Sequence, residues 1–315
     1  MPIQDCDGPI DVMLVYPVIP QGHQLNLPYG YEVPLSVTTV AAYLEQQGIK
    51  TEILDMNLHQ EPYRLLRRFC AKLRPKVVGF TAITSHIYNA HKAATQVKEV
   101  DPQVVTVVGG IHVSAVPEDT LRRFPMFDYG VLGEGEVTFL NFVRHVLEAS
   151  SPQKEHGLAY REDGQPVVNP PRGQIQDLDS LPFAAREKLE HSKYVGSPSN
   201  YLRLPTTSIA TTRGCPYSCT FCSKSVYGRQ SLRHMSPERA VAELEHCIET
   251  LHIRNFKAVD DTMTVKKKWV MAFCELLLKK GLNLSWNASS RVDAADLEML
   301  KLMRRSGCFQ IKWGP

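Results

Sequence analysis

The chain has 315 residues, with 36 Lys and Arg against 33 Asp and Glu and a formal net charge of +3. This length predicts about two domains of roughly 150 residues each, and the interspersed charges argue against a nucleic-acid or membrane-surface partner. The first residues lack the basic stretch of a signal peptide, and no apolar run approaches the ~18 residues of a membrane helix. We therefore expect a cytoplasmic protein that acts on a small molecule.

Residues 1–150 alternate short apolar runs with helical segments. The predicted strands cover residues 12–16, 51–54, 77–81, 104–108 and 129–132. Between them, apolar residues recur with the period of a helix, as Val40, Ala41 and Leu44 do before Gly48. Apolar strands separated by helices predict an α/β domain with a doubly wound, Rossmann-like parallel sheet, and such sheets bind ligands at the carboxyl ends of their strands.

Three loops follow the third, fourth and fifth predicted strands, at residues 81–86, 109–112 and 133–136. Paired glycines can serve only as turn residues, but three such loops at one sheet edge favour a ligand crevice. Neither a phosphate loop nor a Gly-x-Gly-x-x-Gly fingerprint occurs, so a nucleotide is not the favoured ligand. The candidate ligand contacts are Thr84, Gly109, Gly110, His112, Gly133 and Glu134.

Residues 151–205 are rich in Pro, Ser and Gly and predict a linker between two domains. Asp163-Gly164 is a turn signal between residues 158–161 and 167–168, which predicts a small hairpin within this linker.

Residues 206–315 start a second series of strands and helices. Strands are predicted at 208–212, 256–259 and 284–287, and Ser236 followed by Pro237 predicts the start of a helix. These are half-units of a β/α barrel, whose working residues lie at the carboxyl ends of strands. Asp260, Asp261 and Arg291 fall there, although aspartate also begins turns and caps helices.

Cys215, Cys219 and Cys222 lie in one loop that Gly214 opens. Three thiolates converging from one loop would hold a 4Fe-4S cluster and leave one iron with an open position. A zinc site would need a second cysteine pair or histidines at the usual spacing, which the chain lacks. The other five cysteines stand singly, as reduced thiols do, so a disulfide framework is not favoured.

The pattern Cys-x-x-x-Cys-x-aromatic-Cys, with Phe221 as its aromatic residue, resembles the radical S-adenosylmethionine (SAM) enzymes. The resemblance implies that the open iron binds SAM and that reduction cleaves it to methionine and a 5'-deoxyadenosyl radical. It further implies that Phe221 packs on the adenine and that Asp260-Asp261 replaces a Gly-Gly-Glu segment that contacts the SAM amino group. Arg291 is a further candidate for cofactor binding, and a flavodoxin or ferredoxin would donate the electron.

The segments 107–112 and 130–136 look like the cobalamin-binding domain that precedes the radical SAM domain in one large subfamily, and residues 178–182 resemble its Leu-Asp-x-Leu-Pro linker. The resemblance implies that the loops at residues 81–86, 109–112 and 133–136 surround the corrin ring. A bulky residue at Gly110 is expected to prevent corrinoid binding. The Asp-x-His-x-x-Gly triplet that carries the lower cobalt ligand is absent. Cobalamin is therefore expected to bind without that histidine, with His23, His86 and His112 as spare candidates.

The radical SAM barrel has six strand–helix units, and the sequence reaches about three and a half of them. A further C-terminal segment or a partner chain is expected to complete the barrel. We expect a cobalamin-dependent radical SAM methyltransferase that acts on an unactivated carbon. The alternatives are a radical cyclase or rearrangement enzyme, a truncated protein that binds the cofactors without catalysis, and an electron-transfer iron-sulfur protein. The sequence does not name the substrate.

Overall fold

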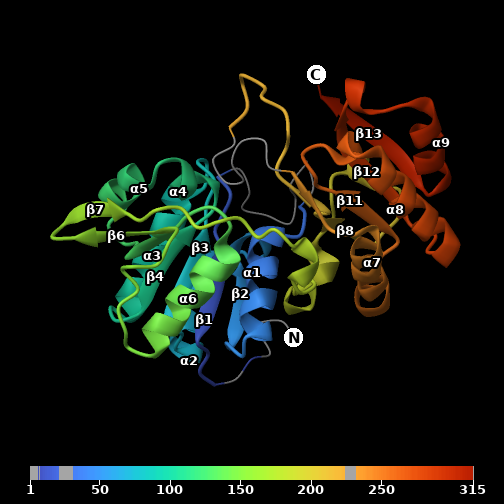
Figure 1. Cartoon of the computed structure of the whole chain (residues 1–315). Helices are drawn as coiled ribbons and strands as arrows, with labels where there is room; N and C mark the ends of the chain where they lie inside the picture. The colour runs from blue at the N-terminus through green and yellow to red at the C-terminus, as the bar shows by residue number, and fades with distance from the viewer. Residues whose placement is uncertain (1–5, 7, 21–30, 224–231, 315) are drawn as a thin grey trace.

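The computed structural model describes residues 6, 8–20, 31–223 and 232–314. They form two α/β units, the first at the left and the second at the right of Figure 1, with residues of the intervening segment between them. The predicted α/β class with a mainly parallel sheet is confirmed. Within the described part of the chain, no helix combines the length and the apolar character needed to cross a membrane.

The first unit contains a seven-stranded sheet with the order β2-β1-β3-β4-β5-β6-β7. β1 to β5 are parallel, as the strand–helix alternation predicts. The strands are β1 (Val12–Tyr16), β2 (Thr51–Asp55), β3 (Val77–Thr81), β4 (Val105–Gly109), β5 (Tyr129–Val131), β6 (Leu158–Glu162) and β7 (Gln165–Val168). The helices are α1 (Leu35–Gln46), α2 (Pro62–Leu73), α3 (Ile87–Val100), α4 (Ile111–Ala115), α5 (Pro117–Arg123) and α6 (Gly135–Leu147).

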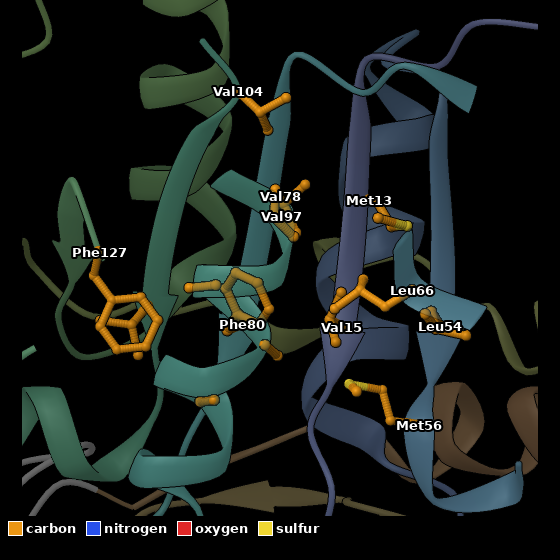
Figure 2. Packing of buried hydrophobic residues seen from close by; sticks show 14 of the residues in the cluster. Met13, Val15, Leu54, Met56, Leu66, Val78, Phe80, Val97, Val104 and Phe127 are labelled. Carbon is orange, nitrogen blue, oxygen red and sulfur yellow. The ribbon is translucent and has the colours of Figure 1, made fainter. Parts of the chain in front are cut away.

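The parallel strands are buried because helices cover both faces of the sheet. On one face, side chains of α2 and α3 pack on alternate strand residues such as Met13, Val15 and Val78, which Figure 2 shows from close by. On the other face, α1 and α6 pack on the strand residues of opposite parity, including Val12 and Leu14. The apolar side chains of these strands therefore contribute to a core on each face of the sheet. The carboxyl ends of the strands lie outside these cores and remain available to a ligand.

The predicted hairpin forms, with β6 and β7 joined through Asp163 and Gly164, both at positive φ (49° and 77°). Two residues at positive φ suit the right-handed twist of a hairpin. β6 also pairs antiparallel with β5, so the hairpin extends the first sheet. Further along, Leu189 and Tyr194 enter the core beneath α1 and α6. The segment expected as a linker therefore supplies structure to the first unit.

The second unit has a parallel sheet with the order β13-β12-β11-β8. Its helices α7 to α9 pack into one core against the sheet. Ser236 accepts a hydrogen bond from the backbone N–H of Arg239 at 3.0 Å, which confirms the predicted start of α7. The elements are β8 (Thr206–Ile209), β9 (Thr212–Arg213), β10 (Arg233–His234), α7 (Pro237–Leu251), β11 (Asn255–Ala258), α8 (Lys267–Lys280), β12 (Ser285–Arg291), α9 (Leu297–Arg305) and β13 (Cys308–Gly314).

Two predicted strands of this unit have wrong boundaries. The expected strand 208–212 is split into β8 and β9, and β9 leaves the sheet to pair with β10. The expected strand 284–287 continues to Arg291 as β12, because β13 pairs with it along this length. The sequence did not predict this extension, because the apolar pattern ends before polar residues such as Ser289 and Ser290. Arg291 is therefore the last residue of a strand.

Candidate functional site

A cavity of about 370 Å³ lies between the carboxyl ends of the two sheets. The first unit lines it with Gly109, Gly110 and Gly133, and the second with Gly214 and Asp260. Two of the three predicted loops of the first unit thus meet the start of the cysteine loop. The third loop contributes Ile83 and His86. The sequence predicted both strand edges separately, and the fold makes them face each other.

Gly110 is required by the backbone. Its φ of 98° lies in the region that favours glycine, and an added Cβ would lie 2.8 Å from the carbonyl oxygen of Ala82. Gly109 differs, because an added Cβ there would meet no atom closer than 3.9 Å. A side chain at Gly110 would first strike the protein's own backbone, and the expectation that bulk there prevents corrinoid binding stays a prediction.

Thr84 and His112 do not line the cavity, although both were predicted ligand contacts. His112 Nδ1 lies 3.1 Å from Thr84 Oγ1, and its ring packs edge-on against Phe124. Burial lowers the pKa of His112. His86, in contrast, lines the cavity beside the ring of Tyr16, and burial lowers its pKa as well. His23 lies outside the described residues.

Glu134 lines the cavity, but its carboxylate has partners that the sequence did not predict. Oε2 accepts from Arg233 Nη1 at 3.0 Å and from Arg213 Nη1 at 3.3 Å, and Arg233 Nη2 donates to Oε1. Arg213 also donates to Glu136. Burial alone would raise the pKa of Glu134, but the two arginines lower it below its ordinary value. The position of Arg213 directly before the cysteine loop could have identified it as a residue of the site. Nothing in the sequence distinguishes Arg233.

Asp260 is buried at the end of β11 and holds the chain that enters the cysteine loop. Its Oδ1 accepts from the backbone N–H groups of Thr211 and Thr212, the former at 2.8 Å, and both threonine hydroxyls also donate to the carboxylate. Burial raises the pKa of Asp260 to about 6, and these hydrogen bonds limit the rise. Asp261 is exposed and lines the cavity. Of the predicted acidic pair, only Asp261 thus presents its side chain to solvent.

The cysteine loop contains Cys215 and Cys219, which are half-buried, and Cys222, which is exposed. The other five cysteines are buried. Over the described ranges, no three His, Cys, Asp or Glu side chains gather closely enough to hold a metal ion. The expectation that Cys215, Cys219 and Cys222 converge on a cluster stays a prediction. Within the loop, the backbone N–H of Cys222 donates to the carbonyl of Cys219 at 3.2 Å. Metal binding commonly brings such ligands together itself.

The chemistry of this donor set fits an iron-sulfur cluster. Three accessible thiols in one loop are the ligands that iron-sulfur clusters use, and no buried cysteine competes with them for access. Phe221 is 79% exposed, so its side chain is open to a planar ligand and is not part of a core.

Arg291 reaches this loop from the end of β12. Its Nη1 donates to Cys219 Sγ at 3.6 Å, and its guanidinium carbon lies 4.2 Å from the centre of the Tyr217 ring. Asp293 accepts two hydrogen bonds from Arg291, at 2.9 and 2.8 Å, and this contact raises the pKa of the guanidinium. The predicted Arg291 is thus adjacent to the predicted ligands, through a contact with Tyr217 that the sequence did not reveal.

Comparison with protein families assigns both halves of the chain. Residues 26–143 match the B12 binding domain, and residues 209–314 match the radical SAM superfamily. The first match contains the loops of the first unit that line the cavity, and the second contains the cysteine loop and Asp260.

Two curated relatives match over most of the chain. An uncharacterized methyltransferase, PH0819, from Pyrococcus horikoshii is 32% identical over 281 residues, which cover 89% of this chain and 60% of that protein. An anaerobic magnesium-protoporphyrin IX monomethyl ester cyclase from Rubrivivax gelatinosus is 33% identical over 288 residues, covering 89% of this chain and 51% of that protein. The chain thus spans between half and two thirds of the length of these relatives.

The fold is similar to that of TsrM from Kitasatospora setae, a radical SAM methyltransferase solved with cobalamin and a [4Fe-4S] cluster bound. The TM-score is 0.76 at 18% identity, and the match covers 97% of this chain and 59% of that one. At this level of identity the likeness concerns the fold alone. The chain belongs to the family of radical SAM enzymes that carry a cobalamin-binding domain.

Proposed function

We propose that this chain binds cobalamin, a 4Fe-4S cluster and SAM, and that it works as a cobalamin-dependent radical SAM methyltransferase. One observation carries the proposal: a single cavity is lined by the glycine loops of the B12 binding domain and by Gly214 and Asp260 of the radical SAM domain. Cofactors of both domains can therefore reach a common substrate. The cavity is lined mostly by apolar residues such as Leu14, Val40 and Phe139, which exclude water from reactive species.

Cys215, Cys219 and Cys222 are the proposed cluster ligands. Gly109, Gly110 and Gly133 would let the corrin ring approach the strand ends, and Phe221, Asp261 and Arg291 are the proposed SAM contacts. When bound, the cluster would supply the electron for reductive cleavage of SAM, and the corrinoid would carry the methyl group. Asp260 holds Thr211 and Thr212, and so sets the direction in which the chain enters the cysteine loop. Thr84 and His112 are not proposed as contacts.

Anaerobic reconstitution tests the proposal. The wild-type chain is expected to hold about four irons and one corrinoid per chain, and to form 5'-deoxyadenosine from SAM under dithionite once the segment or partner chain expected to complete the barrel is supplied. Cys219→Ala is expected to lose the iron and the 5'-deoxyadenosine, while corrinoid binding remains. Cys247→Ala, which changes a buried cysteine of α7 away from the loop, is the matched control and keeps all three.

Either of two results would contradict the ligand assignment: iron retained by Cys219→Ala, or iron lost by Cys247→Ala. Absence of corrinoid from every variant would contradict the cobalamin assignment alone. Cluster without SAM cleavage would favour the alternative of an electron-transfer protein.

A radical cyclase is the second candidate, because one curated relative at 33% identity is a cyclase. S-adenosylhomocysteine distinguishes the two, since it accompanies methyl transfer from SAM. Its formation with a candidate substrate supports the methyltransferase, and product formation without it supports the cyclase. A flavodoxin or ferredoxin as electron donor and a cytoplasmic location stay predictions, as does the division of the chain near residues 150 and 205.

A further inference from the structure

The two ends of the cysteine loop are held by one carboxylate of the first unit. β9 and β10 place Arg213 directly opposite Arg233, and both guanidinium groups donate to Glu134. The exposed fractions of these side chains are 14% for Arg213, 8% for Arg233 and 4% for Glu134. The three cysteines lie between the two arginines in the sequence, so the loop that carries them begins and ends at this contact.

Without its acidic partners, this arrangement would be unfavourable. Like charges directly opposite each other on paired strands are destabilising, and burial strengthens the repulsion. Glu134 and Glu136 supply two negative charges for the two guanidinium groups. Removing one member of such a group leaves an uncompensated buried charge. The pairing of β9 with β10 therefore depends on residues of the first unit.

Glu134 also belongs to the corrinoid side of the cavity. It follows Gly133 and precedes the first residue of α6, and both Gly133 and Glu134 line the cavity. The segment between the domains meets the same point, because the N–H of Ile175 donates to Glu134 at 3.2 Å and its carbonyl accepts from Arg233 at 2.6 Å. A displacement of residues 133–134 thus changes the contacts of both strands that bound the cysteine loop.

We propose that Glu134, Arg213 and Arg233 are positioning residues that couple corrinoid binding to assembly of the cluster; this inference rests on the proposed function. A corrinoid against the loop at Gly133 would fix Glu134 and hence the two ends of the cysteine loop. Less conformational freedom would then be lost when the three thiols converge. Because coupling between two sites is reciprocal, the assembled cluster strengthens corrinoid binding by the same factor, on the order of tenfold.

The test is a titration of the full chain with hydroxocobalamin, followed by absorbance, before and after anaerobic assembly of the cluster. In the wild type, the cluster is expected to lower the dissociation constant about tenfold. In Glu134→Gln, the ratio of the two constants is expected to fall to about one, since a neutral amide cannot compensate two guanidinium groups. Each cofactor should still bind to this variant, because neither thiols nor glycines are changed.

Glu155→Gln is the matched control. It removes a carboxylate of the first unit that pairs with Arg172 at 2.6 Å and does not line the cavity, and it should keep the wild-type ratio. If circular dichroism shows that Glu134→Gln is unfolded, Arg213→Gln replaces it. This variant removes one of the two arginines that connect Glu134 to the cysteine loop and keeps the Glu134–Arg233 pair, so the ratio should fall, and circular dichroism checks that its fold is retained.

The inference is overturned if the ratio of the two dissociation constants is one in the wild type. It is also overturned if the folded variant, Glu134→Gln or Arg213→Gln, keeps the same ratio as the wild type. If both cofactors bind independently, the proposed function stands and only the coupling is refuted. If the wild type takes up no iron or no corrinoid, the proposed function fails and the coupling fails with it.

Discussion

Replacing Asp260 tests whether its hydrogen bonds hold the entrance of the cysteine loop. Asp260→Ala leaves the buried N–H groups of Thr211 and Thr212 without their acceptor. Asp260→Asn keeps a carbonyl oxygen for both N–H groups, and its amide can donate to the Thr211 hydroxyl. Both variants lack the charge, so they differ mainly in these hydrogen bonds. At about 1–3 kcal/mol for each unsatisfied N–H, the alanine variant should be less stable than the asparagine variant by about 2–6 kcal/mol.

The same pair of variants isolates the charge of Asp260. Because its pKa is raised from 3.8 to about 6 in the folded chain, its contribution to stability is fully present below pH 4 and is lost as the pH rises through 6. At about 1.4 kcal/mol per tenfold change in binding constant, the loss is about 3 kcal/mol. Wild type should therefore lose stability relative to Asp260→Asn by about this amount between pH 4 and pH 7.

Tryptophan fluorescence during urea unfolding of the cofactor-free chain measures both effects. The three tryptophans, Trp269, Trp286 and Trp313, all lie in the second half of the chain, so the signal reports the unit that contains Asp260. Alanine and asparagine variants that agree within about 1 kcal/mol would refute the hydrogen-bond argument. A stability difference between wild type and Asp260→Asn that does not change with pH would refute the argument from its pKa.

Two further substitutions separate backbone strain from cofactor effects. Gly110→Ala should destabilise the chain by about 1–3 kcal/mol in circular-dichroism unfolding, because its φ is positive and its Cβ would meet Ala82, whereas Gly109→Ala should cost less than about 1 kcal/mol; equal losses would contradict this difference. Arg291→Gln should lower the midpoint potential of the cluster by tens of millivolts in an EPR-monitored titration, since a nearby cation favours the reduced state and ~59 mV corresponds to a tenfold change. Lys279→Gln, on α8, should leave the potential unchanged, and an equal shift in both variants would show that Arg291 has no specific effect.

Strand runs and helix caps in the sequence predicted most of the fold. Val77–Thr81 and Ser236 are examples, because an apolar run or a cap acts through its immediate neighbours. Ser289 and Ser290 were missed as strand residues, since β13 imposes their conformation from a distant part of the chain. Local pattern thus predicted the elements, and long-range pairing determined where several of them end.

The family and part of the cavity lining were predictable where one residue type has one dominant chemical use. The cysteine spacing, which predicted the radical SAM match, and Gly110, which lines the predicted crevice, belong to this class. Glu134 and His112 do not, because a carboxylate or an imidazole takes whatever partner the fold brings near. Glu134 binds Arg213 and Arg233, and His112 contacts Thr84 inside the first unit. The sequence located the right strand ends, but it could not tell which of their side chains face the cavity.

Residues 185–194 contact both units, so the order in which the chain is synthesised affects the order in which the units can fold. Leu189 and Tyr194 complete the core of the first unit, so this unit can close soon after they leave the ribosome. Arg186 donates a hydrogen bond to Glu243 at 2.7 Å, and Glu243 is synthesised 57 residues later. Arg186 can therefore make this contact only after that interval of synthesis. At about 5–20 residues per second, that interval lasts roughly 3–11 s. The side of the cavity that the first unit forms would thus exist before the strands that bound the cysteine loop have folded onto it.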